Sequence, residues 1–118
     1  MDHKELDVWK KAMDLVEEIY RVSKEFPGHE KYGLTNQIRR AAVSIPSNIA
    51  EGSGRKSDKE LLQYLNFALG SLAETETQIM IAMRLGYTSD ITSSLSLITE
   101  VRKLSLGFRK FVKNKSNL

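Results

Sequence analysis

The stretch QIRRAAVSIPSNIAEGSGR, residues 37–55, decides the fold that this sequence predicts. Around it, inward positions recur at alternating spacings of four and three, which places them on one face of an α-helix. The positions on this face are Leu34, Ile38, Ala41, Ile45 and Asn48. Most neighbouring side chains are alanine or serine, so a second helix can approach closely. We therefore expect a tightly packed helix over residues 33–51.

Pro46 lies inside this helical pattern. A proline has no N–H to donate to the carbonyl four residues earlier, here that of Ala42, and it costs roughly 3 kcal/mol in a helix interior. Serine hydroxyls or the Asn48 amide could satisfy the freed backbone groups. We expect the helix to be kinked at Pro46.

A second helix is expected over residues 5–23, before Phe26 and Pro27 end it. Its predicted inward face comprises Leu6, Trp9, Met13, Val16 and Tyr20. Trp9 could be a stacking platform for a base, but its place on this face favours a core role.

A third helix is expected over residues 57–85, where Ser57 and Glu60 form an S-x-x-E capping box. Residues 61–73 carry no charge, and their apolar side chains lie on more than one face. A helix in an isolated bundle needs one apolar stripe. The surplus, which includes Tyr64 and Phe67, predicts a subunit interface, with a deep core helix as the alternative.

A fourth helix is expected over residues 89–113. Its predicted inward face comprises Leu97, Val101, Leu104, Phe108 and Phe111, widened at the start by Ile91, Leu95 and Ile98. Four amphipathic segments joined by short linkers predict an all-α protein, namely an antiparallel up-down-up-down four-helix bundle. We expect one domain spanning residues 1–118.

The composition narrows the classes of function. The 118 residues include no cysteine, which excludes thiol catalysis and disulfides and suits a reducing cytoplasm. No apolar run approaches the roughly 20 residues that cross a bilayer, so we expect a cytoplasmic protein without a membrane partner. The two histidines have no second ligand at metal-binding spacing, and the linker GSGRKS lacks the spacing of a nucleotide-binding loop. We expect no enzyme activity, metal or cofactor.

Asn48 and Glu51 lie one helical turn apart. They could form catalytic groups, but a structural polar network that fixes helix register is the favoured interpretation.

The net charge of +3 is unevenly distributed. Residues 31–60 hold six basic and three acidic side chains, and residues 91–118 hold six and one. Clustered cations suit a polyanion partner, although basic tails also serve solubility. The candidate nucleic-acid-binding residues are Arg39, Arg40, Arg55, Lys56, Arg102, Lys103, Arg109, Lys110 and Lys113.

Four strings carry a resemblance to a known family: LDVWKKAMDLVEEIY, EKYGLTNQIRRA, RAAVSIPSNIAEGSGR and LQYLNFALGSLAETETQI. Together they resemble the four-helix-bundle proteins encoded in intervening sequences of bacterial 23S rRNA genes. The resemblance implies a cyclic homo-oligomer, described as pentameric, with suspected nucleic-acid binding. Similar bundles are accessory subunits of the reverse transcriptases of diversity-generating retroelements.

Two functional hypotheses follow. The first is an oligomeric module that binds RNA or DNA, or assists an RNA–protein complex, through its basic surface. The second is a protein-interaction scaffold that docks a reverse transcriptase or another protein without touching nucleic acid. In both, Val43, Pro46, Tyr64 and Phe67 are the expected oligomer interface.

Overall fold

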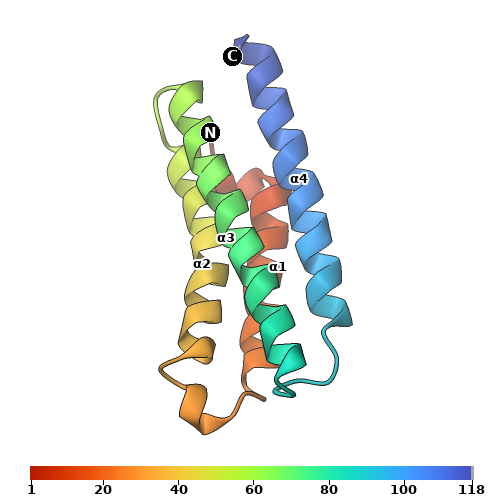
Figure 1. The fold of residues 1–118 in the computed structure, drawn as a ribbon. Helices are drawn as coiled ribbons and strands as arrows, with labels where there is room; N and C mark the ends of the chain where they lie inside the picture. The colour runs from red at the N-terminus through yellow and green to blue at the C-terminus, as the bar shows by residue number, and fades with distance from the viewer. Residues whose placement is uncertain (118) are drawn as a thin grey trace.

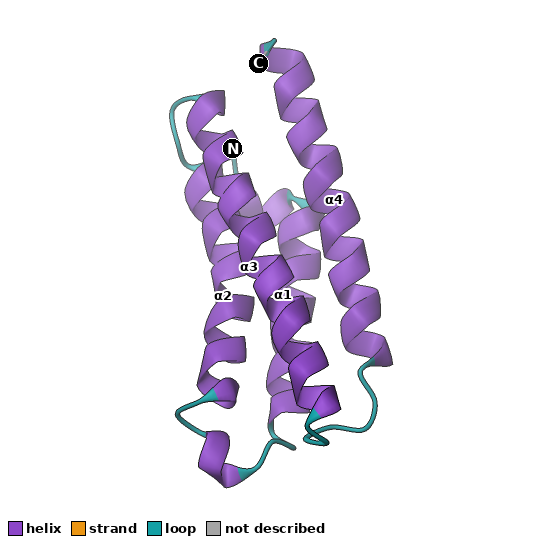
Figure 2. Ribbon diagram, in the orientation of Figure 1, coloured by secondary structure: helices purple, strands orange, loops and turns teal. Residues whose placement is uncertain are grey.

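The computed structural model describes residues 1–117 of the chain, which fold into α-helices joined by short connections (Figure 2). Short 3-10 helices precede the first two α-helices, and the described residues contain no strand. The prediction of an all-α four-helix fold is therefore confirmed. The α-helices are α1 (Asp7–Ser23), α2 (Leu34–Ser53), α3 (Asp58–Arg84) and α4 (Thr92–Ser116), and the 3-10 helices are His3–Glu5 and Gly28–Glu30.

Each helix contacts the next one along the chain, and α4 returns to contact α1. In Figure 1, α1 and α3 end at the lower end of the molecule, whereas α2 and α4 begin there. The most extensive contact joins α2 and α3. The side chains at the centre of this arrangement form one continuous apolar core.

The interior stripe of α1 differs from the predicted one. The buried residues are Val8, Ala12, Leu15, Ile19 and Val22. On the predicted stripe, by contrast, Met13 and Tyr20 are each 39% exposed, and Leu6, Trp9 and Val16 are only partly buried. Both stripes have the spacing of three and four, so periodicity alone could not identify the one that packs inward. As a result, α1 has a second apolar stripe at the edge of the core.

The interior of α4 also departs from the prediction. Phe111 was expected to face inward but is 58% exposed, and the nearby buried residue is Val112. The buried positions Ser94, Ile98, Val101 and Ser105 define the true stripe. Ile98 and Val101 were expected to face inward and are buried, whereas the two buried serines were missed because they interrupt the apolar pattern.

Pro46 lies within α2, which is continuous from Leu34 to Ser53, and a bend at this residue stays a prediction. Pro46 is buried. The Asn48 amide nitrogen donates to the Ser44 carbonyl oxygen at 2.8 Å. This hydrogen bond goes to the Ser44 carbonyl and not to that of Ala42, which is the carbonyl that Pro46 leaves without its helical donor.

The connection from α2 to α3 is held by a close approach and a cap. A Cβ atom placed on Gly52 would lie 2.7 Å from the Cβ of Tyr64, so no other residue fits there without a shift. The Ser57 hydroxyl oxygen accepts a hydrogen bond from the Glu60 backbone N–H at 3.2 Å, which confirms the predicted N-cap of α3. These contacts fix where Tyr64 leaves the helix.

The connection from α3 to α4 lies at the same end of the bundle as the connection from α1 to α2 (Figure 1). Gly86 has a φ of 77°, in the left-handed region where glycine ends a helix without strain. The next residue, Tyr87, packs against Phe26 with 5.8 Å between ring centroids, and its hydroxyl donates to Glu30 at 2.7 Å. Glu30 also accepts the Leu34 backbone N–H at 2.9 Å. One carboxylate thus joins the start of α2 to the α3–α4 connection.

Within residues 1–117, the helices are too short or too polar to cross a lipid bilayer.

Candidate nucleic-acid interface

Arg39, a predicted phosphate contact, is engaged by intramolecular contacts with α1. Its guanidinium lies 4.6 Å from the centre of the Tyr20 ring, and its Nε donates to the Ser23 hydroxyl at 2.8 Å. Cation–π and hydrogen-bond contacts of this kind fix the guanidinium in place. Arg39 therefore joins α2 to the end of α1, whereas its neighbour Arg40 is exposed.

Two arginines of α4 bridge to α3. Arg102 pairs with Glu76 at 2.8 Å, and both side chains are about one-third exposed. Arg109 donates to the side-chain oxygen of Asn66 at 3.0 Å. The α4 arginines are thus engaged with α3, while the lysines of α4 occupy more exposed positions.

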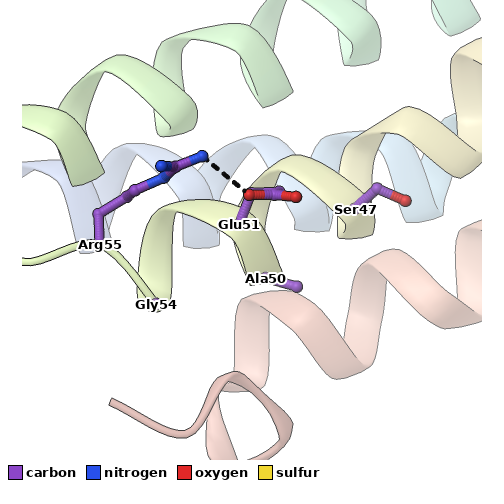
Figure 3. A pocket seen from close by; sticks show the side chains of 5 residues that line it. All are labelled: Ser47, Ala50, Glu51, Gly54 and Arg55. Carbon is purple, nitrogen blue, oxygen red and sulfur yellow. Dashed lines mark hydrogen bonds and ion pairs between the residues drawn. The ribbon is translucent and has the colours of Figure 1, made fainter.

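Arg55 is the centre of a cluster at the α2–α3 connection. Its Nη2 pairs with Glu51 at 3.0 Å, along the last turn of α2 (Figure 3), and also donates to the Tyr64 hydroxyl at 2.7 Å. The guanidinium carbon lies 4.8 Å from the centre of the Tyr64 ring. The open depression beside Arg55 has a volume of about 630 Å³ and is also lined by Ser47, Ala50, Glu51 and Gly54.

The remaining predicted cations are exposed and have no ion-pair partner within the described chain. These residues are Arg40, Lys56, Lys103, Lys110 and Lys113. Lys103 and Lys110 are seven residues apart on α4, so they share its outward face. The predicted set therefore divides into arginines engaged within the fold and cations open to solvent.

A depression between α3 and α4 brings cations from both helices together. We call it the α3–α4 groove; it has a volume of about 580 Å³ and is lined by Lys59, Leu62, Gln63, Asn66 and Lys113. Lys113 was predicted as a contact, but Lys59 was missed. The spacing of Lys59, Gln63 and Asn66 by four and three residues marks one outward face of α3 and could have identified it.

Asp58, one of the two carboxylates that flank Lys59 in sequence, is already engaged. Asp58 accepts a hydrogen bond from the Ser116 hydroxyl and pairs with Lys115 at 3.5 Å. The Ser116 hydrogen bond, followed by the Lys115 charge, lowers the pKa of Asp58 below its ordinary value. Asp58 thus stays ionised and paired with α4, and Lys59 forms no ion pair within the described residues.

Tyr64 and Phe67, two of the predicted interface residues, lie beside the Arg55 cluster. Their ring centroids are 5.5 Å apart, with an interplanar angle of 83°. Tyr64 is half-buried, whereas Phe67 is 48% exposed. The structure therefore links Arg55 to the exposed Phe67 through Tyr64, a combination that the sequence did not reveal because Arg55 and Phe67 are twelve residues apart.

Val43 and Pro46, the other predicted interface residues, lie on a different face. They border a depression of about 380 Å³, which we call the α1–α2 groove. It is lined by His3, Trp9, Met13, Val16, Val43, Pro46, Ser47 and Ala50. Val43 is 40% exposed, whereas Pro46 is buried and offers little surface to a partner. The second apolar stripe of α1 thus forms one wall of this groove.

Asn48 and Glu51 belong to separate clusters. The Asn48 amide donates to the Ser44 hydroxyl at 2.9 Å, and that hydroxyl in turn meets the Ser71 hydroxyl of α3 at 2.8 Å. Glu51 instead pairs with Arg55. Asn48 is therefore linked to α3 through two serine hydroxyls, whereas Glu51 is at the surface and takes no part in that network.

Residues 1–117 contain no group of three or more histidine, aspartate or glutamate side chains that could hold a metal ion.

Comparisons with known proteins place these features in a family context. The family model described as 23S rRNA-intervening sequence protein matches residues 4–107. Among solved structures, the chain resembles a protein of unknown function from the S23 ribosomal protein family of Bacteroides thetaiotaomicron, with 22% identity and a TM-score of 0.64. That match covers 91% of this chain and 95% of the other, and at this identity it shows the fold alone. No curated protein matches the chain.

Proposed function

We propose that this chain, which belongs to the family of 23S rRNA-intervening sequence proteins, is a self-associating, non-enzymatic module that binds nucleic acid through its basic surface. One observation carries the proposal. Lys59 and Lys113, from two different helices, line the α3–α4 groove. Neither has a carboxylate partner among the described residues, so both ammonium groups are available to an anion.

A phosphate backbone is the anion that fits this arrangement best. Lysines that neutralise phosphates release condensed counterions, which supplies affinity without reading the base sequence. The exposed Lys56 and Lys110, on the α2–α3 connection and on α4, extend the positive surface beyond the groove. We therefore propose contacts mainly to phosphate and to the shape of the strand, with weak sequence preference.

Self-association would multiply these contacts. In a cyclic assembly every copy repeats the same cations, so weak contacts act together. The α1–α2 groove supports this step, because its apolar lining includes Met13, 39% exposed, and Val43, 40% exposed. We propose a homo-oligomer, with the pentamer implied by the family resemblance as its expected size, acting in the cytoplasm.

The same groove favours a second candidate function. Its lining contains no lysine, arginine, aspartate or glutamate, as expected for a surface that docks another protein. In this alternative the chain is a scaffold subunit whose partner, such as a reverse transcriptase, binds the α1–α2 groove. The cations would then be dispensable for the interaction.

Fluorescence anisotropy with structured RNA and with duplex DNA tests the proposal. We expect affinity to fall steeply with added salt. The double variant Lys59→Ala/Lys113→Ala should lower the salt slope by roughly 0.7–0.9 for each phosphate that is no longer neutralised. The matched control is Lys10→Ala/Lys24→Ala, which removes the same charge from exposed positions of α1 and its C-terminal end. Absence of binding at low salt, or equal losses of affinity in both double variants, would refute the proposal.

A further inference from the structure

We propose that Phe67 of one copy inserts into the α1–α2 groove of the next copy, so that the chains join head to tail in a closed ring. This pairing rests on the self-association proposed above, and it names the surface of the second copy that fills the groove. Phe67 is a large apolar side chain that is 48% exposed in the middle of α3. The groove lies between the other two helices of its name, so the two are separate surfaces of the same chain.

The ring of Phe67 is held in place from one side. Tyr64 meets it edge to face, with ring centroids 5.5 Å apart, and Arg55 in turn donates to the Tyr64 hydroxyl at 2.7 Å. One turn after Phe67, a Cβ atom placed on Gly70 would have nothing within 4 Å, so another molecule can approach the helix closely there. Phe67 therefore projects from α3 as an apolar knob with open space beside it.

The α1–α2 groove suits such a knob in size and chemistry. Its volume is about 380 Å³, and its lining contains no lysine, arginine, aspartate or glutamate. Trp9 and Met13 line its α1 side, and the small side chains of Ser47 and Ala50 line its α2 side. A phenyl ring inserted among these groups removes apolar surface of both copies from water.

Phe67 lies at the same level along the bundle as this groove. The hydroxyl oxygens of Ser44 on α2 and Ser71 on α3 are 2.8 Å apart, which puts these two residues at one level. The two helices run in opposite directions (Figure 1) and rise equally per residue, so counting from this contact places Phe67 level with Asn48. The residues of α2 that line the groove lie within residues 43–50, a stretch that includes this level.

The charges of the two surfaces are complementary. Residues 60–83 of α3 contain three carboxylates and no lysine or arginine, whereas residues 32–50 contain two arginines and no carboxylate. Glu74, one heptad after Phe67, lines a depression between α2 and α3 together with Arg40, so these two residues also share a level. They form no ion pair within the described residues, and both are available to a second copy. Charge complementarity thus favours a second copy as the occupant of the groove.

The ends of the groove carry the cations. Arg40 lines a depression that shares Val43 with the groove. On the α1 rim, the exposed Lys10 and Glu17 lie one turn before and one turn after Met13, so their charges offset each other. The rim is therefore positive at its Arg40 end.

The opposite end of the groove lies toward the end of α2, which is followed by Arg55 and Lys56. Arg55 is paired with Glu51 at 3.0 Å, whereas Lys56 forms no ion pair within the described residues. Glu60, one heptad before Phe67, is in the first turn of α3 and so lies toward this end. Carboxylates thus flank Phe67 on both sides, and a cation without an ion-pair partner lies toward each end of the groove.

Equal levels determine the kind of assembly. A contact between two different surfaces of a chain repeats from copy to copy, and it closes into a ring when the rotation carries no shift along the axis. A rotation about an axis parallel to the helices brings Phe67 to the level of the next copy's groove without such a shift. The same rotation brings Glu74 to the level of Arg40 of the next copy. The geometry therefore favours a closed ring over an open filament.

Light scattering on mixed variants of the full-length chain tests this pairing. Phe67→Glu and Met13→Glu damage opposite surfaces, and each alone should give particles near the 13.4 kDa of one chain. Mixed in equal amounts, they should form particles of twice that mass and nothing larger, because such a pair retains one intact interface. Phe111→Glu, the identical change at an exposed phenylalanine of α4, is the control and should keep the wild-type mass.

Cross-linking gives a second readout that needs no dissociation. The chain contains no cysteine, so Ser47→Cys in the groove and Gly70→Cys beside Phe67 each introduce a single thiol. Under oxidation, a mixture of the two variants should form covalent dimers about tenfold faster than either variant alone, because assembly raises the effective concentration of the thiols. Thr99→Cys, at an exposed position of α4, replaces Gly70→Cys in the control mixture.

A wild-type mass for Phe67→Glu would overturn the pairing, and so would a mixture of thiol variants that reacts no faster than the control mixture. Ser47→Cys alone reacting as fast as the mixture would show that groove meets groove, which also overturns it. If the wild type still assembles in these cases, self-association stands and only the role of Phe67 fails. A wild type of single-subunit mass at micromolar concentration would remove self-association itself and leave the groove to a different protein.

Discussion

Gly52 of α2 and Tyr64 of α3 approach so closely that a Cβ atom on the glycine would lie 2.7 Å from the Cβ of the tyrosine. The same hypothetical Cβ would lie 3.3 Å from the Leu61 carbonyl oxygen, so two parts of α3 resist it. This close approach lies within the most extensive helix–helix contact of the bundle. It also fixes the tyrosine that supports Phe67.

We predict that Gly52→Ala destabilises the protein by about 1–3 kcal/mol, because α2 and α3 must separate to admit the methyl group. Urea unfolding followed by circular dichroism measures the effect. The control is Gly70→Ala, at a helical position with open space, which should stabilise by roughly 0.5–1 kcal/mol through helix propensity. If both variants changed the free energy of unfolding equally, the close approach at Gly52 would not contribute to stability.

Adjacent arginines on α2 should differ in their effects. Arg39→Ala removes the contacts with Tyr20 and Ser23 and should lower the free energy of unfolding by about 1–2 kcal/mol. Arg40→Ala should leave stability nearly unchanged and weaken RNA binding, since Arg40 is exposed. Parallel urea titrations and anisotropy measurements separate the two. The interpretation is wrong if Arg40→Ala is the more destabilising.

The affinity for nucleic acid should rise when Glu51 loses its charge. Glu51 competes for Arg55 at 3.0 Å, so Glu51→Gln frees the guanidinium for phosphate and removes a repulsive carboxylate. We expect tighter binding of all strands at low salt and a smaller gain at high salt. Glu17→Gln, an exposed change of equal charge on α1, is the control. Weaker binding by Glu51→Gln would instead assign the Glu51–Arg55 pair to positioning the site.

Stability should fall in acid partly through Glu30. The Leu34 backbone N–H, followed by the Tyr87 hydroxyl, lowers the pKa of Glu30 below its ordinary value. A carboxyl with a lower pKa in the folded state stabilises the fold above its unfolded pKa, and this stabilisation is lost as the pH falls through the folded pKa.

Glu30→Gln should therefore flatten the loss of stability below about pH 5, measured as the urea midpoint at successive pH values. Tyr87→Phe removes the second cause alone and should give a smaller effect. Parallel pH profiles for wild type and Glu30→Gln would contradict this prediction.

Self-association should depend on the α1–α2 groove. Met13→Glu places a charge on its exposed apolar wall, and we expect the oligomer measured by light scattering to dissociate. Phe111→Glu puts the same charge on an exposed aromatic position of α4 and serves as the control. A wild type that is already a single subunit at micromolar concentration would remove self-association from the proposal.

The fold was largely predictable because helix periodicity and capping are local properties. Ser57 caps the start of α3 as the sequence indicated, and the helix ends at Arg84, within a residue of the expected end. The choice of inward face was less secure. Two parallel stripes on α1 fit the same period, and Ser94 and Ser105 interrupt the apolar pattern of the buried stripe of α4. Only packing against the other helices decides between such faces.

The candidate site was less predictable than the fold. Charge clustering indicated Lys113, but the intramolecular partners of Arg39 and Arg102 come from other helices and could not be read from sequence. Lys59 gained its significance only because Lys113 lies across the groove. Sequence therefore identified Lys113 and missed Lys59, and the tertiary arrangement determined which of the predicted cations are engaged within the fold.

Because α1 has two apolar stripes, substitutions on its inner stripe and on its outer stripe should have different effects. A substitution at Ile19 alters the interior and destabilises the bundle, whereas one at Met13 leaves that interior intact. Related sequences can therefore change the partner that binds this face by substitutions on the outer stripe while keeping the same fold. The outer stripe of α1 can thus vary in sequence without loss of the four-helix fold.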